Sequence, residues 1–158
     1  RGLVGSEMCI RDRLRRDLIV AHGNDGVFPA PDALIRAIDA EELDLPGRKP
    51  EYLRAVAKAA LTGLLNGPRL RTMPEESARR DLLTVTGIGP FATDLILIRG
   101  ANAQDILPRA ERRLYAEISY QYGPDSVLEE VAERWRPFRS WAAVHLRALR
   151  EQRTREMG

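Results

Sequence analysis

One short stretch of the sequence combines residues that suit phosphate binding with residues that suit a pocket wall. It reads Thr-Gly-Ile-Gly-Pro-Phe and runs from Thr86 to Phe91. The two glycines allow positive φ angles in a tight turn, and their missing side chains let a ligand approach the backbone. The amides of residues 87–89 would also lie just before a helix N-terminus, where unpaired donors favour a phosphate oxygen. The stretch therefore predicts either a non-specific grip on a phosphate backbone or a plain turn plugged by Ile88.

A second stretch, residues 134–141, mixes aromatic and basic side chains in the manner of a nucleic-acid-binding face. Its members are Arg134, Trp135, Arg136, Phe138, Arg139 and Trp141. We take Arg139 as the best phosphate contact among these arginines, because of its position. The helical spacing of Trp135 and Trp141 favours a place in the core for both rings instead.

The histidines and the single cysteine offer little for metal chemistry. We expect His22 at a helix end and His145 packed on the last helix. Cys9 is a lone thiol, and no His and Cys residues cluster with the spacing of a metal site. We therefore expect no catalytic metal and no resident cofactor.

Helices must position these residues, because apolar side chains recur at three- and four-residue spacing from Leu14 onward and long period-two runs are missing. The sequence therefore predicts an all-α domain around one core. We expect helices over residues 14–23, 31–43, 51–65, 76–87, 90–100, 109–123, 126–135 and 139–153. Pro31 is expected in the first turn of its helix.

Two local patterns refine these helices. An apolar stripe is expected on the helix after residue 50, formed by Leu53, Val56, Ala57, Ala60 and Leu61. Thr72 followed by Glu75 fits a capping box, with Pro74 tolerated in the first turn. The helix that begins there would be joined to the next one by residues 87–89 alone.

Composition limits the class of protein. The chain has 158 residues, 44% of them hydrophobic and 30% charged, so it can bury one core. No apolar run reaches the roughly eighteen residues of a membrane span, and no export leader is recognisable, so we expect a cytoplasmic protein. The formal net charge is +2, and nearly all 25 basic residues are arginines, which suit phosphate but also follow from a GC-rich genome.

The first residues look foreign to the fold. Residues 3–12 read as the in-frame translation of a transposon-end sequencing adapter. We therefore treat residues 1–13, including Cys9, as a non-native segment. The domain is expected to occupy residues 14–158 and to be truncated at its N-terminus.

Several motifs in order resemble the helix-hairpin-helix GPD superfamily of base-excision DNA glycosylases, and within it the 3-methyladenine DNA glycosylase II branch. They are LLTVTGIGPFATDLILIRG at residues 82–100, DILP at 105–108 and AERWRPFRSWAAVHL at 132–146. FPAPDAL and LPGRKPEYLRAVA, ahead of the hairpin, are also similar to that branch. The resemblance covers residues 28–147.

This resemblance implies that Thr86, Gly87, Ile88 and Gly89 hold the backbone of double-stranded DNA, often with a bound monovalent cation, beside an extruded damaged base. Bifunctional relatives carry an attacking lysine two positions after the hairpin, where this chain has Phe91. The implied enzyme is therefore monofunctional: it releases an alkylated purine without cutting the strand. Phe91 and Leu95 would line the base pocket. Packing of Phe91 against Leu95 in the core is the alternative.

One position departs from the family pattern. In the family an aspartate stabilises the oxocarbenium-like sugar as the base leaves, and here Glu111 stands at that place. The extra methylene moves the charge by roughly an ångström, which can cost on the order of a hundredfold in rate. The alternative for Glu111 is a solvent-facing acid in a first helical turn. Asp105 is the second catalytic candidate, and Asp94 is expected to support the turn or face an arginine.

Three functions stay open. The first is a monofunctional glycosylase that acts as a monomer on damaged DNA, as a bacterial protein associated with the nucleoid. The second is a non-catalytic helix-hairpin-helix DNA-binding protein that has lost the standard aspartate. The third is a fragment with neither activity.

Overall fold

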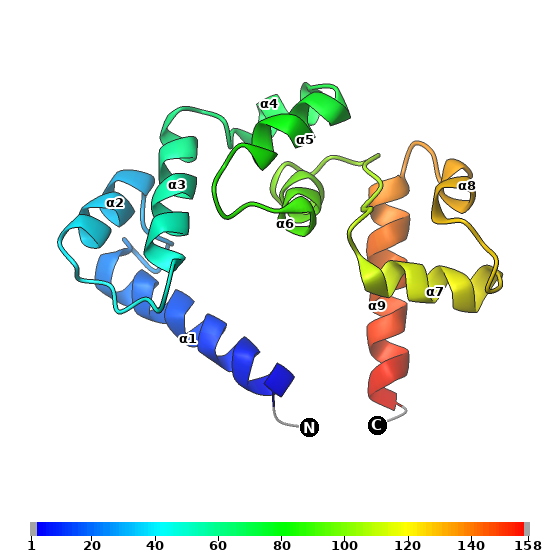
Figure 1. The fold of residues 1–158 in the computed structure, drawn as a ribbon, viewed down its shortest axis with the longest axis horizontal. Coiled ribbons are helices and arrows are strands. Elements are labelled where there is room, and N and C mark those ends of the chain that lie inside the picture. The colour runs from blue at the N-terminus through cyan, green and yellow to red at the C-terminus, as the bar shows by residue number, and fades with distance from the viewer. Residues whose placement is uncertain (1–2, 157–158) are drawn as a thin grey trace. The chain divides into compact units, whose positions relative to one another are not determined.

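Helices form the regular structure of the chain. A computed structural model describes the backbone of residues 3–156 and the side chains of residues 12–154 (Figure 1). Within this range no β-strand occurs, and Asn24 and Val27 form only an isolated bridge. The all-α prediction is therefore confirmed. None of the helices described is both long and apolar enough to cross a membrane.

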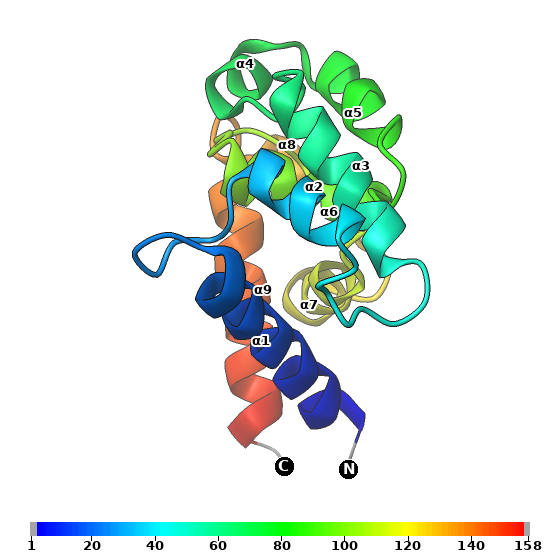
Figure 2. The same ribbon diagram turned by 90° about the vertical axis from the view of Figure 1, so that its left-hand side faces the viewer.

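The chain divides into two compact units, Arg1–Gly63 and Leu64–Gly158. The first contains α1 (Leu3–His22), α2 (Pro31–Asp39) and α3 (Lys49–Leu61). In this unit α2 lies along α3 and contacts α1 (Figure 2). Its buried cluster is formed by Leu18, Leu34, Ile38 and Ala57.

Several predicted helix ends in the first unit are confirmed. Pro31 begins α2 in its first turn, and α1 ends at His22, which pairs with Glu42 across 3.6 Å. The adapter-like residues 1–13 fall partly in α1 and partly outside the described residues, so their origin stays a prediction.

The predicted stripe on α3 is only partly right. Leu53 packs against the cluster and Ala57 is buried, but Leu61 remains 58% exposed. Leu61 is the last residue of α3, so no further helical turn extends its apolar face.

The second unit carries the remaining elements. They are α4 (Gly67–Thr72), α5 (Glu75–Leu83), α6 (Pro90–Leu95), the π-helical segment η1 (Ile96–Gly100), α7 (Arg112–Tyr122), α8 (Leu128–Glu133) and α9 (Arg139–Glu156). The α5–loop–α6 pair is the predicted helix-hairpin-helix, and α7 packs across α9 (Figure 1).

The predicted capping box does not form. Thr72 is the last residue of α4, a helix missing from the prediction, and its hydroxyl donates back to the carbonyls of Pro68 and Arg69 at 3.2 and 3.1 Å. Pro74 instead stands at the N-cap of α5, without a side-chain hydrogen bond.

The connection between α5 and α6 is longer than residues 87–89. The helix α5 ends at Leu83, because the amides of Thr84 and Val85 donate to carbonyls three residues back, at 3.2 and 3.1 Å. The tighter bonding stops the α-helical pattern, so the connection is residues 84–89.

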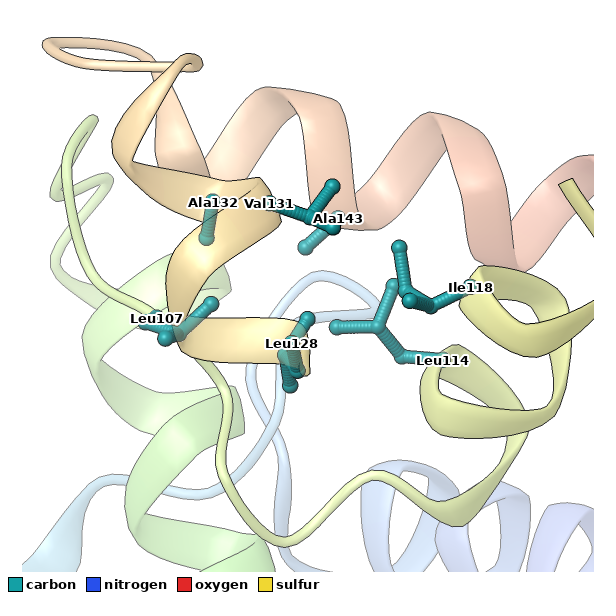
Figure 3. Close-up of a cluster of buried hydrophobic side chains, with 7 residues drawn as sticks. All are labelled: Leu107, Leu114, Ile118, Leu128, Val131, Ala132 and Ala143. Atoms are coloured by element: carbon teal, nitrogen blue, oxygen red, sulfur yellow. The ribbon is translucent and has the colours of Figure 1, made fainter. Parts of the chain in front are cut away.

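The core of the second unit joins α7, α8 and α9 (Figure 3). The side chains that meet there are Leu107, Leu114, Ile118, Leu128, Val131, Ala132 and Ala143. Trp135 packs against this cluster as predicted. Trp141 does not: it is 53% exposed, and its ring stacks on that of Phe138 with centroids 5.3 Å apart.

Truncation of this core tests the packing. Leu114 is fully buried, so Leu114→Ala should lower the free energy of unfolding by about 2–5 kcal/mol through lost burial and a cavity. Leu149 is the control, because it lies in α9 of the same unit but is 45% exposed. Leu149→Ala should change the free energy of unfolding by about 0.5 kcal/mol or less. Denaturant unfolding followed by circular dichroism measures both, and equal losses would contradict the assignment of the core.

Candidate DNA-binding hairpin and base pocket

The hairpin connection is held by its own backbone and by one apolar side chain. Gly87 has a φ of 93°, a conformation that favours glycine. Ile88 is 8% exposed, and its amide donates to the carbonyl of Val85 at 3.0 Å. Ile88 is therefore the apolar plug, and its amide is already used within the turn. Of the predicted phosphate-binding residues, Thr86, Gly87 and Gly89 are exposed.

Gly89 differs from Gly87 because its backbone conformation does not require glycine. Its φ of −98° and ψ of −179° are ordinary extended backbone, open to any residue. A Cβ added there would meet nothing within 4 Å. Neither local conformation nor packing within the chain demands glycine at this position. The open space is what a close approach of a ligand backbone would need.

Directly after the hairpin lies a small, mostly apolar cavity. Its walls are Phe91, Asp94, Leu95, Ile98, Arg99, Pro108, Glu111, Ala143, Val144 and Arg147. The predicted pocket residues Phe91 and Leu95 thus share one cavity with the predicted catalytic Glu111. Its volume is about 30 Å³, room for one or two water molecules rather than a purine.

One side of this cavity is formed by an exposed aromatic ring. Phe91 at its rim is 45% exposed, so its ring is not held in a closed core. A second hollow of about 320 Å³ borders the cavity and shares Ile98, Arg99 and Val144 with it. Trp141 and His145 line the second hollow. His145 was predicted to be packed, but it is exposed.

Glu111 is a carboxylate at the start of a helix, and each of its two oxygens has a partner. It stands at the N-cap of α7, where Oε1 accepts a hydrogen bond from the amide of Arg113 at 3.2 Å. Oε2 lies 3.4 Å from Nε of Arg147. The residue is 9% exposed, so the alternative of a solvent-facing acid does not describe it.

Asp94 holds the segment that carries Glu111. Its side chain is 3% exposed and accepts from Nη1 of Arg79 at 2.5 Å and from the amide of Ala110 at 3.1 Å. Arg79 also donates to the carbonyl of Leu107 at 2.9 Å. Burial lowers the pKa of Arg79, but the hydrogen bonds to Asp94 and Glu75 outweigh it and raise the pKa. Asp94 therefore supports the turn and faces an arginine, as expected.

Arg139 and Asp105 form a second buried pair. Nε of Arg139 lies 2.7 Å from a carboxylate oxygen of Asp105, and Arg139 also donates to the Asp105 carbonyl at 2.7 Å. Burial raises the pKa of Asp105, but the hydrogen bonds from Arg139 outweigh it and lower the pKa. Arg139 is 7% exposed, so its guanidinium is used inside the protein and does not offer the predicted phosphate contact. Asp105 is not among the cavity walls.

Arg147 is the site residue that sequence reasoning missed. It lies on α9 three residues after Val144 and four after Ala143, both of which line the cavity. This helical spacing was the available signal. What hid it was the general abundance of arginine in the chain.

The assembled site suits one kind of chemistry. An apolar cavity with one aromatic wall accepts a flat ring, and a carboxylate at its edge stabilises a positive charge that develops nearby. The hairpin two residues before Phe91 offers exposed glycines to a backbone. Helix-hairpin-helix geometry with such a pocket is the arrangement of enzymes that remove damaged bases from DNA.

Comparison with known proteins agrees with this class. No protein-family model matches the chain. DNA-3-methyladenine glycosylase 2 of Escherichia coli is 30% identical over 121 residues, which is 75% of this chain and 42% of the relative. DNA-3-methyladenine glycosylase 1 of Schizosaccharomyces pombe is 26% identical over 132 residues, 78% of this chain and 58% of the relative. A DNA-3-methyladenine glycosylase of Bacillus subtilis is 24% identical over 128 residues, with 76% and 42% covered.

These matches show that about three quarters of the chain is similar to base-excision DNA glycosylases. Among these enzymes it is similar to the 3-methyladenine glycosylases, glycosylase 2 of Escherichia coli among them. The chain spans about half the length of the curated relatives that it matches.

The two hairpin glycines should respond differently to alanine. Gly87→Ala places a Cβ on a positive φ and should lower the free energy of unfolding by about 1–2 kcal/mol. Gly89→Ala has ordinary angles and open space, so its change should stay within about 0.5 kcal/mol. Thermal and denaturant unfolding of the pair measure this difference, and a larger loss in Gly89→Ala would refute it.

Removal of the Asp94 carboxylate should be costly. Asp94→Ala leaves Arg79 as a buried charge without its closest partner, so the free energy of unfolding should fall by about 3–5 kcal/mol. Asp81→Ala removes the partner of Arg69 in a pair that is one-third or more exposed, and should cost about 1 kcal/mol or less. Similar losses of unfolding free energy in both variants would show that the Asp94–Arg79 pair does not stabilise the fold more than the Asp81–Arg69 pair.

Proposed function

We propose that the chain acts as a monofunctional DNA glycosylase that removes alkylated purine bases of the 3-methyladenine type in base-excision repair. One observation carries the proposal: Phe91, Leu95 and Glu111, separated in sequence, line one cavity directly after the hairpin. The names of the relatives support the same activity.

The proposed reaction gives separate roles to the hairpin backbone, to Phe91 and to Glu111. Exposed backbone at Gly87 and Gly89 holds the DNA strand while the damaged base leaves the stack. Phe91 packs on the extruded ring. The Glu111 carboxylate stabilises the sugar cation as the bond from C1′ to the base nitrogen breaks. Water then adds its hydroxyl to C1′, and its proton goes to solvent or to the released base. No amine attacks the sugar, because Phe91 stands where bifunctional relatives carry a lysine.

The proposal includes the binding partners. The substrate is double-stranded DNA with a damaged base, and the protein acts as a monomer in a bacterial cytoplasm, on the nucleoid. The reaction needs no resident cofactor. A monovalent cation at the hairpin, held by backbone carbonyls such as those of Val85 and Gly89, would add positive charge beside a phosphate. Both oxygens already accept one hydrogen bond, and each keeps a second lone pair.

A non-catalytic DNA-binding protein is the second candidate. The observation in its favour is that both oxygens of Glu111 are engaged, one by the amide of Arg113 and one by Arg147. In addition, the cavity is smaller than a base. Catalysis therefore requires Glu111 to exchange partners and the rim to open when DNA binds.

Base release decides between the two. Under single turnover, a duplex with a methylated purine should lose its base, and Glu111→Gln should slow release by on the order of a hundredfold or more, because it removes the charge that meets the sugar cation. Glu76→Gln, an exposed acid on α5, is the matched control and should release the base at the wild-type rate. Folding is checked by melting, and duplex binding by titration.

The same experiment separates binding from chemistry. Gly89→Ala should keep the fold but weaken duplex binding, because its Cβ occupies the space proposed for the DNA backbone. No release by a wild-type protein that is folded and binds the duplex would reject the glycosylase and leave the binding protein.

A further inference from the structure

Two aromatic side chains at the start of α9 are exposed and stacked on each other. Phe138 directly precedes α9 and Trp141 lies in its first turn, and their ring centroids are 5.3 Å apart with an interplanar angle of 25°. Phe138 is 46% and Trp141 is 53% exposed, whereas Trp135 packs against the core. Two rings that already hold each other in place can accept a further flat ring with little additional loss of side-chain entropy.

The hollow beside Trp141 carries positive charge and no carboxylate. Its volume is about 320 Å³, and it is lined by Ile98, Arg99, Asn102, Trp141, Val144 and His145. Arg99 and His145 are exposed, and neither side chain forms a hydrogen bond or an ion pair with the part of the chain that the structure describes. A guanidinium without an acidic partner suits a phosphate. The charge of the hollow therefore fits an anionic ligand.

The hollow also continues the candidate DNA-binding site. It shares Ile98, Arg99 and Val144 with the cavity beside the hairpin, where Phe91 is 45% exposed. A strand whose backbone lies on the hairpin can therefore extend into the hollow on the surface of the second unit. Exposed aromatic rings combined with unpaired positive charge are the two features that bind single-stranded nucleic acid, through its base faces and its phosphates.

We propose that Trp141, backed by Phe138, is a stacking platform for an unpaired nucleobase of single-stranded DNA, whose phosphate is held by Arg99 and His145. The inference goes beyond the proposed function, because this binding needs no damaged base and breaks no bond. Bases within a duplex stack on one another and do not expose their faces. The platform therefore acts where the bound DNA is unpaired, for example at a single-stranded extension beside the duplex that the hairpin holds.

The test compares single-stranded with duplex DNA. Fluorescence anisotropy with a labelled, undamaged oligothymidylate and with a blunt undamaged duplex gives the ratio of the two association constants. Trp141→Leu should lower this ratio by about fivefold to a hundredfold, because the stacking of one base is lost. Trp141→Phe keeps an aromatic face and should retain most of the ratio. Tyr122→Leu is the matched control: Tyr122 is 47% exposed but lies on α7, outside this hollow, so the ratio should stay at the wild-type value.

Two further measurements do not depend on the folding of the leucine variant. Trp141 is one of two tryptophans in the chain, and the other, Trp135, is packed. Oligothymidylate should therefore quench the tryptophan fluorescence of the wild-type protein but not that of Trp141→Phe. Arg99→Gln should reduce the slope of log affinity for oligothymidylate against log salt concentration by about 0.7, because one phosphate contact is lost.

The outcomes separate this proposal from the glycosylase function. A lower ratio in Trp141→Leu, together with quenching of the wild-type protein, supports the platform. An unchanged ratio in a folded Trp141→Leu, or a wild-type protein that binds duplex but not oligothymidylate, overturns it. Self-association that Trp141→Leu abolishes, without quenching by oligothymidylate, also overturns it and assigns the face to a second copy of the chain. Base release from the methylated duplex is measured separately, and its absence rejects the glycosylase function alone.

Discussion

The buried ion pair between Asp94 and Arg79 connects the hairpin helix to the segment that carries Glu111. Two charges removed from water need close partners and further hydrogen bonds, and both are present: the amide of Ala110 for Asp94 and the carbonyl of Leu107 for Arg79. Because the same four groups come from α5, α6 and the loop before α7, none of these parts can shift without breaking the pair. The pair therefore fixes the position of the hairpin helices relative to the segment that carries Glu111.

A firm support does not make the pocket ready for a ligand. The cavity holds little more than water, and Glu111 is restrained by the amide of Arg113 and by Arg147. Two wall residues are less enclosed: Phe91 is exposed, and the side chain of Arg147 is only partly buried. The Glu111 carboxylate is thus held by an ion pair and a backbone hydrogen bond, and any ligand that uses it has to compete with these contacts.

The Glu111 carboxylate contacts two helices, α7 and α9. It caps α7 through Oε1 while its side chain brings Oε2 to within 3.4 Å of Arg147 on α9.

The sequence by itself determined the all-α class, the hairpin motif and the place of Pro31 in a first helical turn, because helical periodicity and glycine and proline chemistry are local properties. The expectation that Phe91, Leu95 and Glu111 share a site came from the resemblance to a family, and these three residues do line one cavity. The sequence could not decide which arginine is paired inside the protein and which lines the cavity. Arg139 is buried against Asp105, Arg79 supports the segment that carries Glu111, and Arg147 is part of the cavity wall, although all three look alike in sequence. Trp141 is exposed and Trp135 packed despite similar spacing. Only tertiary structure settles such choices, since the partner of a charged or aromatic side chain lies on another helix, distant in the chain.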